Sequence, residues 1–145
     1  MVTFTSRSPE ETEALGQSWG LSARSGQVIG LTGDLGAGKT QLVKGLARGL
    51  GVKSQVHSPS FALVHEYTDG RLPLFHIDLY RLQSASQIIG AGLEEYFYNP
   101  PGVTVIEWVE RWTPSASAMP HPYRQVTIQT LSDAERRITY EDFGP

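Results

Sequence analysis

Residues 33–40 read GDLGAGKT and follow closely on the apolar run VIGL at residues 28–31. The octet fits the pattern GxxxxGK[ST], in which glycines let successive backbone N–H groups turn inward around a phosphate chain. In such a loop Lys39 neutralises the β- and γ-phosphate oxygens, and Thr40 offers its hydroxyl to Mg²⁺. The stretch therefore predicts a nucleoside triphosphate site; the alternative is a glycine-rich helix start without a ligand.

The length and composition of the chain limit what can surround this loop. Its 145 residues fit one domain, residues 1–145, with a core large enough to need no disulfide staples. The absence of cysteine excludes disulfides and thiolate metal sites. The histidines lack the paired helical spacing of a zinc site, so we interpret them as surface or strand residues: His57, His65, His76 and His121.

The charge and hydropathy of the chain narrow the choice of partners. Twelve basic and fifteen acidic residues give a net charge of −3, which is not the footprint of a protein that binds nucleic acid by itself. The first residues, MVTFT, do not resemble a signal peptide, and no run approaches 18 apolar residues. We expect a soluble cytoplasmic protein that binds neither membranes nor DNA.

Apolar periodicity, caps and turn residues predict alternating elements along the chain. Helices are expected at residues 8–23, 39–50, 84–89 and 94–97, and strands at residues 2–5, 27–32, 61–67, 72–77, 103–106, 124–131 and 136–140. Asp69-Gly70 is expected to turn one antiparallel hairpin and Ser132-Asp133 another, and residues 114–122 to form an exposed loop. The fold class is α/β: a single P-loop NTPase-like domain whose central mixed sheet is flanked by helices.

Two carboxylates at predicted strand ends supply the acidic groups that phosphate chemistry needs. The strand LFHID ends in Asp78, a position suited to hold Mg²⁺ directly or through water, although this aspartate can instead simply cap the following turn. The strand VTVI is followed by Glu107, which would polarise the attacking water or complete the metal shell, or else be a solvated strand end. Sheets of this class bind ligands at the carboxyl ends of their parallel strands.

Four segments, taken in order, carry a family resemblance. These are GDLGAGKT, then SPSF at residues 58–61, HIDLYR at 76–81 and VIEW at 105–108. Over roughly residues 5–112 the chain resembles the TsaE (YjeE) family, the small ATPase of bacterial tRNA threonylcarbamoyladenosine (t6A) biosynthesis. The HxDxYR and IEW segments are more specific than the phosphate loop. The resemblance implies ATP and Mg²⁺ as ligands and TsaD and TsaB as partners, with tRNA met only through that complex.

The resemblance also implies roles for individual residues. Lys39 grips the phosphates, Thr40 and Asp78 hold Mg²⁺, and Glu107 is the acidic group near the γ-phosphate and a further metal ligand. The catalytic residues would thus be Glu107 and Lys39. The nucleotide would touch Asp34, Leu35, Gly36, Ala37, Gly38, Lys39, Thr40, Gln41 and Trp108. An Asn-Lys-x-Asp guanine motif does not occur, which favours ATP over GTP.

The chain departs from the family pattern in two places. Ser60 stands where the family usually has threonine, which keeps the hydroxyl and loses a methyl group. Residues 113–145 match no family motif, so their structure is predicted from pattern alone. Two roles also stay open: Arg81 either stabilises transferred charge or pairs with a carboxylate or a partner, and Trp108 either shields the nucleotide or packs in the core.

Two other functions share the phosphate loop. A small-molecule phosphotransferase needs an acceptor pocket and usually an arginine-rich lid, and the longest unassigned stretch, residues 113–123, holds no Arg or Lys. A nucleotide-sensing module without turnover would not need Glu107 for hydrolysis. Activity assays separate both from a partner-dependent ATPase.

Overall fold

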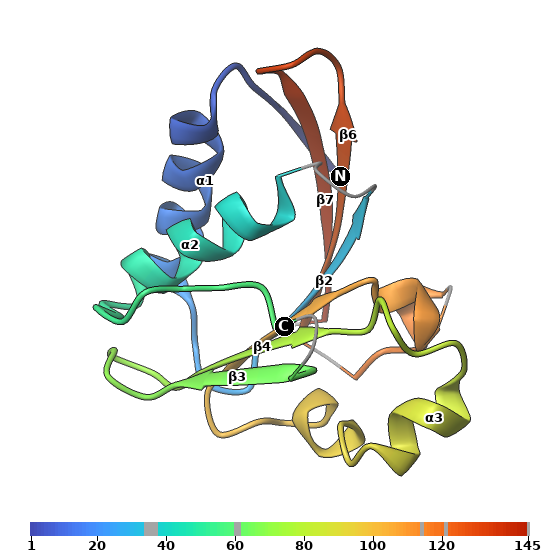
Figure 1. Cartoon of the computed structure of the whole chain (residues 1–145). Coiled ribbons are helices and arrows are strands. Elements are labelled where there is room, and N and C mark those ends of the chain that lie inside the picture. The colour runs from blue at the N-terminus through green and yellow to red at the C-terminus, as the bar shows by residue number, and fades with distance from the viewer. Residues whose placement is uncertain (34–37, 60–61, 114, 121, 145) are drawn as a thin grey trace.

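The computed structural model describes residues 1–33, 38–59, 62–113, 115–120 and 122–144 of the chain. Its helices are α1 (Pro9–Ser22), α2 (Lys39–Gly49) and α3 (Ala85–Gly90), with 3₁₀ turns η1 (Glu94–Phe97), η2 (Val109–Arg111) and η3 (Ala116–Ala118). Its strands are β1 (Val2–Ser6), β2 (Val28–Gly33), β3 (Val64–Tyr67), β4 (Leu74–Asp78), β5 (Val103–Glu107), β6 (Tyr123–Thr130) and β7 (Arg136–Phe143). The expected order of elements is confirmed (Figure 1).

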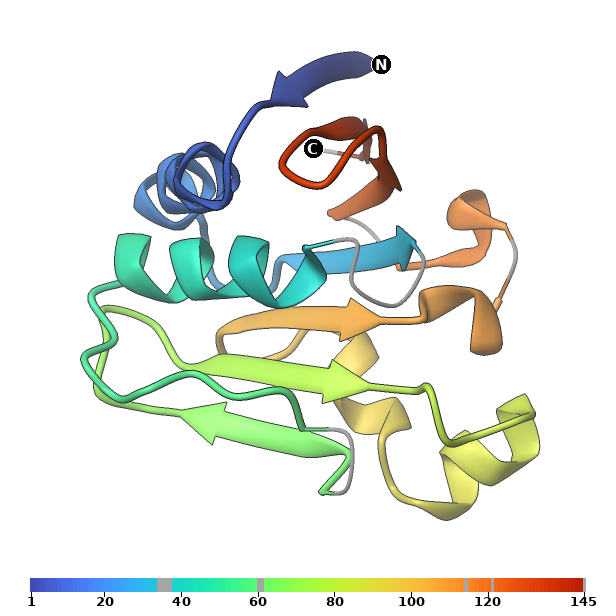
Figure 2. The ribbon, with the colours of Figure 1, turned by 45° about the horizontal axis from the view of Figure 1, so that its top comes forward.

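One mixed sheet organises the described part of the chain, with seven strands in the order β1-β7-β6-β2-β5-β4-β3. The central strands β6, β2, β5 and β4 run parallel to one another, whereas β7 and β3 pair antiparallel with β6 and β4, and β1 pairs antiparallel with β7. The carboxyl ends of four parallel strands therefore meet at a single edge (Figure 2). The prediction of a mixed sheet flanked by helices is confirmed.

The two faces of the sheet bury separate apolar clusters. Helices α1 and α2 cover one face, where Leu42 and Leu46 belong to the same cluster as Leu31 and Val105 (Figure 2). The other face packs against α3 and η1, through a second cluster whose members include Ile88, Phe97, Ile77 and Ile106. Because strand residues alternate between faces, the odd-numbered residues 103–107 of β5 face α2 and the even-numbered ones face α3. Glu107 thus projects to the α2 side.

Helix α1 begins where its capping residues predict. The Ser8 side chain accepts a hydrogen bond from the Glu11 backbone N–H at 3.1 Å, and the Glu11 carboxylate accepts from the Arg7 N–H at 3.0 Å. Pro9 takes the first helical position, where its missing N–H costs nothing. These reciprocal bonds satisfy donors that a helix start otherwise leaves open.

Helices α1 and α2 approach each other unusually closely through glycines. A Cβ atom built on Gly16 would lie 2.3 Å from the Leu42 carbonyl oxygen, and one on Gly45 would lie 2.0 Å from the Glu13 carbonyl oxygen. Gly20 and Gly49 face the opposite helix in the same way. Backbone packs on backbone here, so side chains larger than hydrogen do not fit without moving a helix.

The first antiparallel pair differs from the prediction in its limits. Strand β3 begins at Val64, because Leu63 adopts φ 69°, a left-handed backbone that cannot continue a strand. The predicted start, residue 61, lies outside the described residues. The expected Asp69-Gly70 turn is part of a longer link between Tyr67 and Leu74, and the Asp69 carboxylate accepts hydrogen bonds from the N–H groups of residues 53 and 54. The antiparallel pairing itself is confirmed.

Residues 113–145 were predicted from pattern alone. The closing hairpin is confirmed, with β6 and β7 paired antiparallel around residues 131–135. The predicted exposed loop at residues 114–122 is exposed only in part: among its described residues 115, 117 and 118 are exposed, whereas Met119 is 2% exposed and joins the second apolar cluster. Within the described residues, we find no helix that is both long and apolar enough to cross a membrane.

Candidate functional site

Chemically active side chains gather at the carboxyl edge of the parallel strands. Strand β2 ends at Gly33 and α2 begins at Lys39, so the glycine-rich stretch joins the central strand to the helix above it. In the β4–β5 register Asp78 lies directly opposite Glu107, and in the β2–β5 register Leu31 lies opposite Glu107. The sheet thus brings both predicted carboxylates to the edge where the glycine-rich stretch begins.

The structure describes only part of the predicted nucleotide-contacting set. Asp34, Leu35, Gly36 and Ala37 lie outside the described residues, as do Ser60 and Phe61. Gly38 precedes α2 with φ 96°, a backbone conformation that glycine adopts without strain. Thr40 and Gln41 lie in the first turn of α2, and the helix dipole makes this end of the helix favourable for anions. The Gln41 side chain points away to α1, where its amide donates to the Glu13 carboxylate at 3.3 Å.

Lys39 is buried and held by groups of the site. Its Nζ donates to the Gly33 carbonyl oxygen at 2.6 Å and lies 3.9 Å from the centroid of the Trp108 ring. Only 5% of the residue is exposed. A lysine so enclosed carries a desolvated charge, so an anion that reached Nζ would be bound strongly.

Trp108 contacts both the candidate site and the second apolar cluster. Its backbone is left-handed, with φ 62°, and its N–H donates to the Leu31 carbonyl oxygen at 3.0 Å. The ring centroid lies 5.2 Å from that of Tyr80, and the residue also packs against the second apolar cluster. The ring therefore supports Lys39 directly, which the sequence left undecided.

Asp78 is 4% exposed, and two donors among the described residues reach its carboxylate. Its Oδ1 accepts from the Tyr80 N–H at 2.9 Å, and its Oδ2 faces the Ser58 hydroxyl at 3.4 Å. The first bond is the turn cap that the sequence analysis gave as the alternative, and the second joins Ser58 to the end of β4. The cap and a role in the site are compatible, because the two oxygens of an ionised carboxylate together offer about four lone-pair positions.

Glu107 is also 4% exposed, and its Oε2 lies 2.5 Å from His76 Nε2. His76 has no exposed surface and stands two residues before Asp78 on β4. Sequence reasoning interpreted His76 as a surface or strand residue and as the first residue of the HxDxYR segment, and it missed the place of this side chain beside Glu107. The available signal was the spacing, since residues two apart in a strand project to the same face.

The oxygen atoms that could bind a metal ion at this site come from different helices and strands. Within the described ranges, no group of three or more His, Asp or Glu side chains is arranged to hold a metal ion alone. Thr40 in the first turn of α2 and Asp78 at the end of β4 offer hydroxyl and carboxylate oxygens, the donors Mg²⁺ prefers. Such a set fits Mg²⁺ that also binds a phosphate, since Mg²⁺ is usually held by one or two carboxylates together with substrate phosphates. Arg81 is exposed beyond the strand end, and its role stays open.

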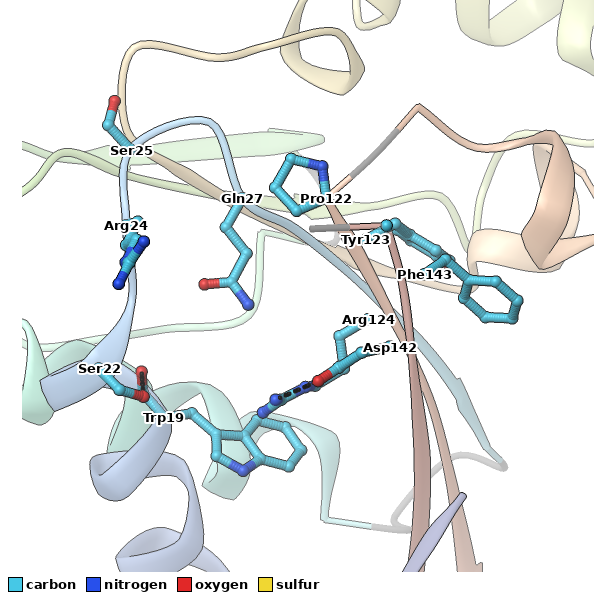
Figure 3. A pocket seen from close by; sticks show the side chains of 11 residues that line it. Trp19, Ser22, Arg24, Ser25, Gln27, Pro122, Tyr123, Arg124, Asp142 and Phe143 are labelled. Atoms are coloured by element: carbon cyan, nitrogen blue, oxygen red, sulfur yellow. Dashed lines mark hydrogen bonds and ion pairs between the residues drawn. The ribbon is translucent and has the colours of Figure 1, made fainter.

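A separate cavity of about 350 Å³ lies at the opposite end of the sheet, near the amino ends of β2 and β6 (Figure 3). Arg124 crosses its wall, pairing with Asp142 at 2.6 Å and stacking 4.8 Å from the Trp19 ring centroid. The Arg124 hydrogen bond lowers the pKa of the Asp142 carboxyl below its usual range. None of the predicted site residues lines this cavity.

The fold and the site define an α/β domain in which a glycine-rich stretch links a central strand to a helix beside two strand-end carboxylates. The family model described as "Threonylcarbamoyl adenosine biosynthesis protein TsaE" matches residues 6–138. The chain therefore belongs to the TsaE family, as its motifs indicated.

Individual relatives agree with the family assignment. The chain is 42% identical over 136 residues to the tRNA threonylcarbamoyladenosine biosynthesis protein TsaE of Bacillus subtilis, covering 94% of this chain and 82% of the relative. It is 48% identical to the protein of the same name from Nostoc sp., covering 93% and 76%. The crystal structure of Bacillus subtilis YdiB superposes with a TM-score of 0.80 at 38% identity, covering 99% of this chain and 86% of that one.

Proposed function

We propose that this chain binds ATP with Mg²⁺ and hydrolyses it slowly as a component of the t6A machinery. It acts with TsaB and TsaD to sustain transfer of threonylcarbamoyl to adenine 37 of tRNA. The observation that carries the proposal is the convergence of Lys39, Asp78 and Glu107, all buried, at the strand edge beside the glycine-rich stretch. Family membership supports the pathway.

Lys39 and the start of α2 bind the phosphates in this proposal. The enclosed ammonium group exchanges its bond to the Gly33 carbonyl for phosphate oxygens, and Trp108 stays beside it as a wall. The backbone N–H groups of the first helical turn supply further donors, aided by the helix dipole. The large desolvation of Lys39 favours an anionic ligand over water.

Thr40 and Asp78 hold Mg²⁺ in this proposal, and Glu107 lies opposite Asp78 on the neighbouring strand β5. When bound, the ion neutralises charge on the phosphates. Asp78 retains its Tyr80 N–H and Ser58 contacts, which orient the carboxylate. Glu107, in register with Asp78 on the neighbouring strand, accepts a proton from the attacking water or orients that water toward the γ-phosphate.

Turnover by the isolated chain is slow in this proposal. Hydrolysis depends on positioning and on charge stabilisation, and in many such systems an arginine that completes the site comes from a partner. TsaD and TsaB supply the missing groups or conformational change. The net charge of −3 favours contact with tRNA through the complex and not directly, in a cytoplasmic setting.

A reconstituted modification assay tests the proposal. Purified TsaB, TsaD, tRNA and the threonylcarbamoyl donor are combined with and without this chain, and t6A formed per TsaD is followed over many turnovers. We expect sustained t6A formation only when the chain and ATP are both present. Equal yields without the chain would refute the proposal. Transfer of phosphate to a nucleoside or sugar would indicate a phosphotransferase, and ATP binding without turnover would indicate a sensing module.

A further inference from the structure

We propose that His76 is a positioning residue for Glu107: it donates a hydrogen bond that fixes one carboxylate oxygen and directs the other toward the attacking water. The inference rests on the proposed function, because it assigns Glu107 a role in ATP hydrolysis. It adds a residue that does not itself touch the nucleotide.

The sheet places the two side chains together. His76 on β4 and Glu107 on β5 belong to neighbouring parallel strands, and both project to the face covered by α2. The Nε2–Oε2 distance is 2.5 Å, and the side chains are 0% and 5% exposed. Water does not compete for this bond, so the contact is strong and directional.

The chemistry of the pair fixes the direction of the hydrogen bond. An ionised carboxylate only accepts, so Nε2 must carry the proton. Nδ1 is buried and has no hydrogen-bond partner within the described residues. The neutral tautomer with a proton on Nε2 leaves only a lone pair at Nδ1, whereas a proton there would leave a buried donor unsatisfied. His76 is therefore committed to Glu107 and to no other described group.

A fixed Glu107 matters because water has to be held in line with the phosphate. A glutamate side chain has three rotatable bonds, and its entropy must be removed before the carboxylate can act as a base or an orienting group. His76 removes this freedom at Oε2 and leaves Oε1 for the water. Displacement of a catalytic group by about 1 Å costs on the order of a hundredfold in rate.

Two substitutions of nearly equal polarity test the proposal. In His76→Gln the amide nitrogen reaches the place of Nε2, whereas in His76→Asn it reaches only that of Nδ1. We expect His76→Gln to keep kcat for ATP hydrolysis within about threefold of wild type, and His76→Asn to lower it by about tenfold or more. ATP affinity, measured by calorimetry, should stay unchanged in both, because His76 does not contact the nucleotide.

A control variant tests whether perturbing the buried part of the sheet in general lowers kcat. Thr104 is buried on β5, and its hydroxyl donates to the Tyr96 carbonyl oxygen at 2.7 Å, on the face away from Glu107. Thr104→Val should lower thermal stability and leave kcat unchanged. Equal kcat values for His76→Asn, His76→Gln and wild type would overturn the proposal, as would a loss in His76→Asn explained by weaker ATP binding.

A spectroscopic measurement tests the pairing of His76 with Glu107 without an assay of ATP hydrolysis. In long-range ¹H–¹⁵N spectra of the full nucleotide-free chain, His76 should show the neutral tautomer with its proton on Nε2, and this proton signal should move in Glu107→Gln. A proton on Nδ1, or a signal indifferent to Glu107→Gln, would overturn the proposal even if the variants fail to fold. If wild type does not hydrolyse ATP with its partners, the proposed function fails while the tautomer result still reports on the pair.

Discussion

The contact between α1 and α2 gives a stability prediction that can be worked from the coordinates. In Gly45→Ala the new Cβ would lie 2.0 Å from the Glu13 carbonyl oxygen, 2.8 Å from the Glu13 carbonyl carbon and 3.0 Å from the Gln17 nitrogen. All three are backbone atoms of α1, so no side-chain rotation relieves the overlap. The helices have to move apart by about 1 Å.

Two opposing contributions decide how much Gly45→Ala changes the free energy of unfolding. Replacing glycine by alanine inside a helix stabilises the helix by about 1 kcal/mol. Overpacking a well-filled contact costs about 1–3 kcal/mol, and here the whole of α2 has to shift because rigid backbone is involved. Parting the helices also loosens packing around Leu42 and Leu46. We expect Gly45→Ala to destabilise the chain by about 1–2 kcal/mol, which lowers Tm by about 3–7 °C.

Gly90→Ala provides the matched control. Gly90 ends α3, and a Cβ built there meets nothing within 4 Å. The free energy of unfolding of the Gly90→Ala variant, measured by urea denaturation and circular dichroism, should equal that of wild type or exceed it by up to about 1 kcal/mol. A Gly45→Ala variant as stable as wild type, or as Gly90→Ala, would refute the reasoning that backbone contact limits this interface.

Three further predictions follow from the site and from one titrating group. Lys39→Ala should weaken ATP binding with or without Mg²⁺, whereas Asp78→Ala should mainly remove the Mg²⁺ dependence; calorimetry showing the reverse would contradict the assigned roles. The isolated chain should turn over ATP well below the tens per second of efficient kinases, and a rate in that range would be inconsistent with partner dependence. The hydrogen bond to the Glu66 carboxylate raises the pKa of Tyr96 to about 12 from 10.0, so the stability it contributes is full below pH 10 and is lost as pH rises to 12. Denaturant titrations across that window should show a shallower decline for Tyr96→Phe, and equal slopes would count against the bond.

Local patterns predicted the framework of the site well. The apolar runs ending in Asp78 and Glu107 and the capping pattern at Ser8 are each contained in a few consecutive residues, so local physics suffices to predict them. The glycine-rich octet is an equally local pattern, but residues 34–37 lie outside the described residues. The register that sets Asp78 opposite Glu107 confirmed that the two carboxylates share one edge. The roles assigned to them in nucleotide chemistry stay predictions.

Features that depend on tertiary contacts could not be predicted from the sequence. The pairing of His76 with Glu107 joins residues 31 positions apart and requires β4 and β5 to be neighbours, which strand patterns do not specify. The left-handed Leu63 and the buried Met119 likewise reflect packing that overrides local preference. No local signal marked Gly45 as a helix contact, because glycine has many uses.

Steady-state ATP hydrolysis with and without partners tests the central claim most directly. The chain is assayed alone and with purified TsaB, TsaD and tRNA, as wild type and as Glu107→Gln. We predict slow turnover alone, clear stimulation by the partners, and loss of the stimulated rate in Glu107→Gln with ATP binding retained. Absence of stimulation, or a Glu107→Gln rate equal to wild type, would contradict the claim that this edge of the sheet hydrolyses ATP in t6A synthesis.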